Sequence, residues 1–148
     1  MAHGARLDAD PRHIVKISAE DLALLWPGVP GSEFLDRAVA SGVGLAIITQ
    51  GASGASAATS RTRIEVPARP VSVVDTVGAG DSFQAALLAW LSRTLALRRE
   101  ALALITEREL QATLRFACAA AGLTCSRRGA DLPTREEIEL ALAAADDS

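Results

Sequence analysis

The chain has 148 residues, of which 49% are hydrophobic but only 3% aromatic, and a net charge of -3. This length suffices to bury the core of one domain, and the composition is that of a globular α/β protein rather than a disordered one. The slightly acidic balance, without basic residues interleaved with aromatic ones, argues against a nucleic-acid partner. Apolar stretches stay well short of the roughly 20 residues that span a bilayer, so we expect a cytoplasmic protein with no membrane partner.

The chain begins with a polar stretch over residues 1–13, which predicts a flexible tail in front of an ordered unit over residues 14–148. Residues 14–17 form a short β-rich run that predicts a strand. Ser18 follows at once, with Asp21 three positions later, which is the pattern of a capping box. A strand is therefore expected to lead directly into a helix.

A second helix is predicted over residues 32–40, with Gly42 as its end signal. The apolar run over residues 45–49 is typical of a buried strand. These segments give β-α-β order, as in an α/β domain. Residues 55–59 and 62–66 predict a hairpin beyond it.

The middle of the chain has the order strand, glycine loop and helix. Residues 71–74 predict a strand, residues 75–80 a loop, and residues 81–97 a strongly apolar helix that begins with an acid. This unit carries the chemistry discussed below.

Two further helices are predicted from their start signals. Thr106 and Glu109 have capping-box spacing, and the helix should run to about Gly122. Thr134 and Glu137 repeat the spacing at the start of the last helix.

The loop over residues 75–81 holds the candidate chemistry. Two glycines, Gly78 and Gly80, open a helix, so successive backbone N–H groups can converge on one anion. Phosphoryl transfer needs such donors, and it needs a nearby carboxylate to accept the proton of the attacking hydroxyl. Asp81 is the candidate for that base. The alternative is that the glycines only make a sharp turn and Asp81 only complements the helix dipole.

Residues 74–83, Val-Asp-Thr-Val-Gly-Ala-Gly-Asp-Ser-Phe, resemble the C-terminal signature of the PfkB family of ribokinase-like carbohydrate kinases. The resemblance implies a three-layer α/β/α sandwich with a mostly parallel sheet, of which this chain would be the C-terminal, nucleotide-binding part. It also implies that Gly78, Ala79 and Gly80 form an anion hole and that Asp81 is the catalytic base.

A second stretch, residues 48–55, resembles the family's Thr-x-Gly-x-x-Gly turn. The resemblance implies that Thr49, Gly51 and Gly54 approach the nucleotide, although a plain strand-to-strand turn would also explain them. Cys118 falls where several relatives carry an Asn near the adenine base, which implies a place in the same pocket.

The resemblance further implies ATP, Mg²⁺ and, as in many members, K⁺. Residues 14–22 resemble the fructokinase form of the stretch that elsewhere carries Asn-x-x-Glu near the magnesium and phosphates, which places Ser18 and Asp21 at the matching positions. A plain capping box is the alternative for this pair. Asp75 matches a residue that helps to hold a monovalent cation, and its alternative role is to close an Asx-turn. Lys16 is expected to be a surface residue, since nothing near it in the sequence builds a ligand set.

Residues 15–18, Val-Lys-Ile-Ser, and residues 76–81, Thr-Val-Gly-Ala-Gly-Asp, resemble fructokinases more than ribokinases. This resemblance implies ATP-dependent phosphorylation of fructose, with ATP and a small sugar as the binding partners. The alternative substrates are 2-keto-3-deoxygluconate, ribose and a nucleoside. Members of the family are roughly twice as long, and their N-terminal sugar-binding signature has no counterpart in this sequence. The alternative is therefore a truncated ATP-binding module without sugar kinase activity of its own. A sheet that lacks several strands would also expose an edge through which the chain could self-associate.

Overall fold

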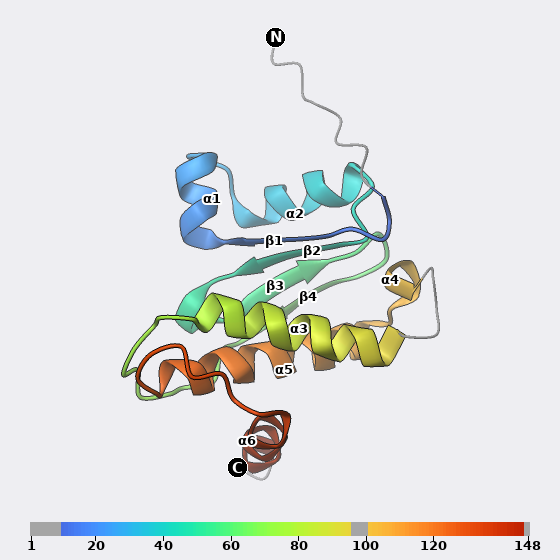
Figure 1. Cartoon of the computed structure of the whole chain (residues 1–148). Coiled ribbons are helices and arrows are strands. Elements are labelled where there is room, and N and C mark those ends of the chain that lie inside the picture. Colours follow the sequence, from blue (N-terminus) through green and yellow to red (C-terminus); the bar gives the residue numbers. More distant parts are fainter. Residues whose placement is uncertain (1–9, 96–100, 147–148) are drawn as a thin grey trace.

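The computed structural model describes residues 10–95 and 101–146 of the chain. Figure 1 shows a sheet with helices on both of its faces. The elements in chain order are β1 (Ile14–Ser18), α1 (Ala19–Leu25), α2 (Gly31–Ala40), β2 (Leu45–Thr49), the 3₁₀ turn η1 (Gly51–Ser53), β3 (Ala55–Ala58), β4 (Arg63–Val66), α3 (Ala79–Leu95), α4 (Ala101–Leu104), α5 (Glu107–Cys125) and α6 (Arg135–Asp146).

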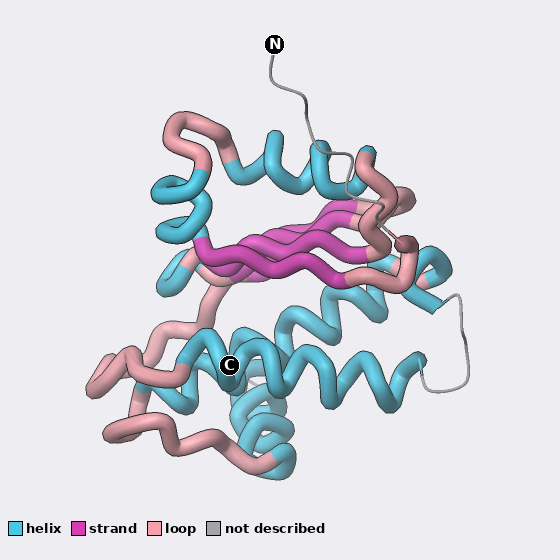
Figure 2. Tube along the Cα trace, turned by 45° about the horizontal axis from the view of Figure 1, so that its top comes forward, coloured by secondary structure: helices cyan, strands magenta, loops and turns pink. Residues whose placement is uncertain are grey.

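Three layers result, and a separate apolar core fills each side of the sheet. α1 and α2 cover one face, where Leu22 and Leu35 pack with Ala46 and Ile48. α3 and α5 cover the other face with a larger core, and α6 crosses on the outside of α5 (Figures 1 and 2). The expected α/β/α sandwich is confirmed for this part of the fold.

The sheet has the order β1-β2-β3-β4. β1 and β2 are parallel, whereas β2 with β3 and β3 with β4 are antiparallel. In the described strands the parallel character is therefore confined to one pair. The reason is connection length, because parallel neighbours need a crossover such as α1–α2, while the turns around β3 are short and reverse the chain.

The predicted helix starts carry the expected caps. The hydroxyl of Ser18 accepts from the amide of Asp21 at 3.0 Å. Thr106 and Glu109 form a complete capping box at the start of α5. The amide of Thr134 donates to the carboxylate of Glu137 at 2.6 Å ahead of α6. The hairpin of β3 and β4 is also confirmed.

The predicted strand over residues 71–74 is wrong. This segment has no strand pairing, and the amides of Val74 and Asp75 both donate to the carbonyl of Cys125, at 2.8 and 3.1 Å. Pro67 and Pro70 separate the segment from β4, and proline cannot donate to a sheet ladder. The β-branched run therefore crosses to the end of α5 instead of extending the sheet.

Two further boundaries differ from the prediction. α3 starts at Ala79, two residues earlier than expected, and the end predicted at Leu97 lies outside the described residues. Most of the predicted tail, residues 1–9, also lies outside them. Residues 10–13 form a turn, in which the amide of His13 donates to the carbonyl of Asp10 at 2.8 Å.

Neighbouring leucines of α3 test which face of this helix holds the core. Leu87 is 1% exposed and Leu88 is 47% exposed. We expect Leu87→Ala to lower the free energy of unfolding by about 2–5 kcal/mol, because it leaves a cavity under the sheet. Leu88→Ala should change it by less than about 0.5 kcal/mol. Urea denaturation of both variants measures the difference, and equal losses would contradict the assigned core face.

Candidate active site

The predicted site residues other than Cys118 lie at or next to one end of the sheet. The strand register aligns Ser18 of β1 with Thr49 of β2, Ala55 of β3 and Val66 of β4 at this end. The N-terminus of α3 lies at the same end of the molecule (Figure 1). Ligands of open α/β sheets bind at the carboxyl ends of parallel strands, and the ends of β1 and β2 both lie here.

Gly78 fixes the shape of the loop that precedes α3. Its φ is +81°, and a Cβ at this position would lie 2.9 Å from the Cβ of Ala130. A side chain is therefore disfavoured both by the backbone conformation and by the neighbouring loop. Gly78 packs its backbone directly against the loop that follows α5.

Asp75 binds the same two loops together. One carboxylate oxygen accepts from the amide of Val77 and the other from the amide of Gly129, each at 3.0 Å. These two bonds hold the pKa of Asp75 below its usual range. The bond to Val77 is the Asx-turn that the sequence offered as one of two roles for Asp75. The cation role stays a prediction.

A buried hydroxyl pair connects the first turn of α3 to α5. The hydroxyl of Thr124 donates to that of Ser82 at 2.8 Å, and Ser82 donates to the carbonyl of Ala120 at 3.2 Å. Both side chains are 2% exposed or less. The start of α3 is thus anchored from inside the core as well as from the loop.

This anchoring leaves backbone donors free at the helix start. The amides of Gly80 and Asp81 have no acceptor within residues 10–95 and 101–146, as is usual in the first turn of a helix. Gly80 has open space around it, because only the Nζ of Lys16 would come within 4 Å of a Cβ there, at 3.9 Å. Asp81 is exposed in the same turn. Two free N–H groups and a carboxylate therefore share one accessible helix end.

The turn between β2 and β3 contains the three other residues predicted to bind nucleotide. Thr49 is half-buried at the end of β2, and Gly51 is exposed with a φ of +53°. Packing alone explains a glycine at position 54, because a Cβ there would lie 2.0 Å from the carbonyl oxygen of Val66. The structure brings this turn to the end of the sheet where α3 begins, and its nucleotide contacts stay a prediction.

Cys118 and Asp21, two of the predicted site residues, differ in solvent exposure. Cys118 is 8% exposed and belongs to the core cluster, and burial raises the pKa of its thiol to about 11. Asp21 is exposed, in the first turn of α1. Among the described residues, no group of three His, Cys, Asp or Glu side chains could hold a metal ion. A magnesium ion bound to this part of the chain would have fewer than three such side chains as ligands and would depend on substrate phosphates and water for the others.

Lys16, predicted to be a surface residue, lies beside the start of α3. Its side chain is half-buried, and its Nζ lies 5.8 Å from the centroid of the Phe83 ring. The signal was available in the strand alternation, because Ile14 packs into the core beneath α3 and Lys16 lies two residues on. The strand pattern predicts an aliphatic residue at this position, and Lys16 departs from that pattern.

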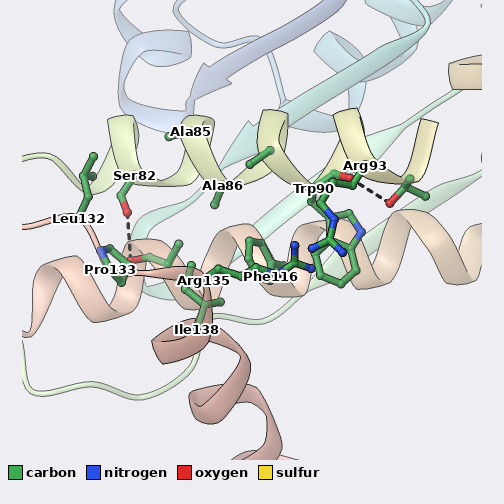
Figure 3. Close-up of a pocket in the computed structure, with 13 residues that line it drawn as sticks. Ser82, Ala85, Ala86, Trp90, Arg93, Phe116, Leu132, Pro133, Arg135 and Ile138 are labelled. Carbon is green, nitrogen blue, oxygen red and sulfur yellow. Dashed lines mark hydrogen bonds between the residues drawn. The ribbon is translucent and has the colours of Figure 1, made fainter. Parts of the chain in front are cut away.

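A cavity of about 460 Å³ lies between α3, α5 and α6 (Figure 3). Trp90 and Phe116 line it, with ring centroids 4.7 Å apart, and small alanines leave the space open. Ser82 is the one residue that it shares with the first turn of α3. Its walls are mostly hydrocarbon, whereas the glycine loop has free donors beside a carboxylate. We therefore place the candidate active site at the loop and not in this cavity.

Comparison with known proteins agrees with this arrangement. The sequence profile of the pfkB family carbohydrate kinases matches residues 12–137. That match includes the glycine loop, the turn after β2 and both loops that hold the start of α3. The chain therefore belongs to the pfkB family of carbohydrate kinases.

Three relatives illustrate the similarity. A fructokinase from Rhizobium leguminosarum bv. trifolii is 40% identical over 114 residues, which cover 74% of this chain and 34% of the relative. The structure of a fructokinase from Xylella fastidiosa with bound ATP has a TM-score of 0.76 at 26% identity, and covers 90% of this chain and 43% of its own.

A double mutant of the fructokinase from Vibrio cholerae O395, solved with fructose, ADP and a potassium ion, has a TM-score of 0.68 at 26% identity, with 88% and 39% covered. The chain thus spans about a third to two fifths of the length of these relatives. Within residues 10–95 and 101–146, every helix is too short or too polar to span a lipid bilayer.

Gly78 and Gly28 form a matched pair for testing the loop contact. Both have a φ of +81°, but only Gly78 would meet a neighbour within 4 Å. We expect Gly28→Ala to cost about 1–2 kcal/mol of unfolding free energy from the backbone conformation. Gly78→Ala should cost a further ~1–3 kcal/mol from the contact with Ala130. Thermal or urea unfolding separates the two, and equal costs would show that the contact with Ala130 contributes nothing.

Proposed function

We propose that residues 14–148 are the nucleotide-binding, catalytic part of a kinase that transfers the γ-phosphoryl group of ATP to a sugar hydroxyl. The observation that carries the proposal is the start of α3, where the free amides of Gly80 and Asp81 stand beside the Asp81 carboxylate. Membership of a carbohydrate kinase family supports the same reaction.

The roles divide along the loop. The amides of the Gly78–Gly80 segment would stabilise charge on the transferring phosphoryl group, in an anion hole that α3 strengthens with its dipole. The Asp81 carboxylate would accept the proton of the attacking hydroxyl, which typically contributes ~10²–10⁴-fold in rate. Both functions lie within one helical turn, so the hydroxyl and the phosphoryl group would meet in front of it.

ATP is the phosphoryl donor in this proposal, with its nucleotide held near Thr49, Gly51, Gly54 and Cys118. Magnesium would neutralise charge on the phosphates, with Asp21 as the candidate carboxylate. Asp75 is the candidate for a monovalent cation such as K⁺. Both of its carboxylate oxygens already accept backbone N–H groups, so an ion would have to share them.

Fructose is the proposed sugar, and the supporting observation is the similarity to fructokinases. Specificity is expected to depend on a part of the kinase with no counterpart in this chain, since the relatives are more than twice as long. We propose the cytoplasm as the location, because the proposed reaction uses ATP and a sugar that are both dissolved in water.

A second candidate function is an ATP-binding module without turnover. Three valines next to the glycine loop favour it, because Val73, Val74 and Val77 are 63%, 56% and 59% exposed. Apolar side chains uncovered at the site itself indicate that a further polypeptide segment completes it. The chain alone would then bind nucleotide but lack the sugar pocket.

Calorimetric titration with ATP and Mg²⁺ tests the anion hole. We expect the wild-type chain to bind and Gly80→Asp to bind at least about tenfold more weakly, because the new carboxylate repels the phosphates. The variant should be no less stable, since an acid in the first turn complements the helix dipole. Gly80→Ala is the control, because it adds the Cβ without the charge and has no close neighbour to displace.

The outcomes separate the two candidates. Binding by the wild type together with fructose phosphorylation that Asp81→Asn abolishes supports the kinase reading for the chain alone. Binding without phosphorylation supports the module. Equal binding by wild type and Gly80→Asp, or no binding by a folded wild type, would refute the anion hole.

We further propose that the chain self-associates through the free edge of β1. β1 lies at one end of the strand order, and the alternation along it directs the backbone groups of Ile14 and Lys16 away from β2. Sedimentation velocity over micromolar concentrations should show a concentration-dependent dimer. A monomer throughout would contradict this proposal.

A further inference from the structure

Lys16 is the single lysine among the 148 residues, and it lies on the sheet face that packs against α3. Along β1, Ile14 packs into the core beneath this face and Ile17 into the core on the opposite face. Because side chains alternate, Lys16 shares the face of Ile14. A cation thus occupies a strand position that would normally hold an aliphatic side chain.

The ammonium group is held next to the start of α3. It lies 5.8 Å from the centroid of the Phe83 ring and 3.9 Å from the place that a Cβ on Gly80 would take. Contact with the aromatic ring restrains its position. Its side chain therefore extends from the middle of β1 toward the first turn of α3, next to Gly80.

No carboxylate neutralises this charge among the described residues. All ion pairs of residues 10–95 and 101–146 are formed by arginines, and Asp81 is not within 4.0 Å of the ammonium group. The positive end of the α3 dipole lies beside the ammonium group and repels a cation. The pairing of Lys16 with this helix end is unfavourable until an anion binds between them.

We propose that Lys16 contacts the phosphate groups of the nucleotide, together with the free amides at the start of α3. The proposal rests on the proposed function of that loop and adds to it a side chain from a different element. A polyphosphate would receive hydrogen bonds from Gly80 and Asp81 and a charge-assisted one from Lys16. Binding would place a negative charge between the ammonium group and the positive end of α3.

The single lysine makes a direct test possible. A chain labelled with ¹³C and ¹⁵N in lysine alone gives one lysine side-chain signal, and a glycine-labelled chain reports the Gly80 amide. We expect Mg²⁺–ATP and inorganic tripolyphosphate to shift both signals, and adenosine to leave Lys16 unshifted. A shift at Gly80 without one at Lys16 would overturn this proposal and leave the anion hole intact. No shift at either would refute both.

Substitution tests the energetic role. Lys16→Met keeps the length of the stem without the charge, and should weaken ATP binding by about tenfold to a hundredfold, the usual range for a charge-assisted hydrogen bond. In Lys16→Met, the affinity for adenosine and the free energy of unfolding should both stay at the wild-type value. If Lys16 had only a structural role, its loss should lower the free energy of unfolding. Lys16→Arg should recover most of the ATP affinity.

Arg61→Met is the matched control. It removes one positive charge from the β3–β4 turn, at the opposite end of the sheet from Ser18 and Thr49. ATP affinity should then change less than about twofold, because a single exposed charge at that distance is screened by salt. Wild-type ATP affinity in Lys16→Met, or equal losses in Lys16→Met and Arg61→Met, would show that Lys16 does not contact the phosphates.

Discussion

The start of α3 is held in place by the close approach of the Gly78 backbone to Ala130 in the loop after α5. Asp75 reinforces this contact by accepting from the amide of Gly129 in the same loop. On the inner side, the hydroxyls of Ser82 and Thr124 connect the same two segments. The amides of Gly80 and Asp81 are therefore aimed by residues some fifty positions further along the chain. A loop that looks self-contained in sequence acquires its geometry from α5.

Whether a segment was predicted correctly depends on whether its structure is determined by neighbouring residues or by distant ones. Segments controlled by local rules were predicted well, as in the capping box of Thr106 and Glu109 and the start of α6 at Thr134. The run over residues 71–74 has strand composition, but its amides bond to the carbonyl of Cys125, and no local pattern indicates so distant an acceptor. The burial of Lys16 was unexpected for a related reason. Its neighbours Gly80 and Phe83 lie more than sixty residues away in the sequence.

The two cores of the sheet explain how a partial kinase fold can still form an ordered unit. Leu45 and Ile47 face α3 and α5, while Ala46 and Ile48 face α1 and α2, so β2 is buried on both sides. Helices of this chain therefore cover both faces of β2. Val73, Val74 and Val77, beside the glycine loop of the candidate site, are by contrast more than half exposed.

This distribution has a consequence for catalysis. In the chain as described, the free amides and Asp81 are accessible to water, which satisfies them at little cost but also screens their attraction to phosphate. A segment that covered Val73, Val74 and Val77 would exclude water from the same place and strengthen each electrostatic interaction there. Lys16 differs from the other donors because Phe83 already shields it on one side. Such a segment would therefore dry the start of α3, where the Lys16 ammonium group already lies beside Gly80.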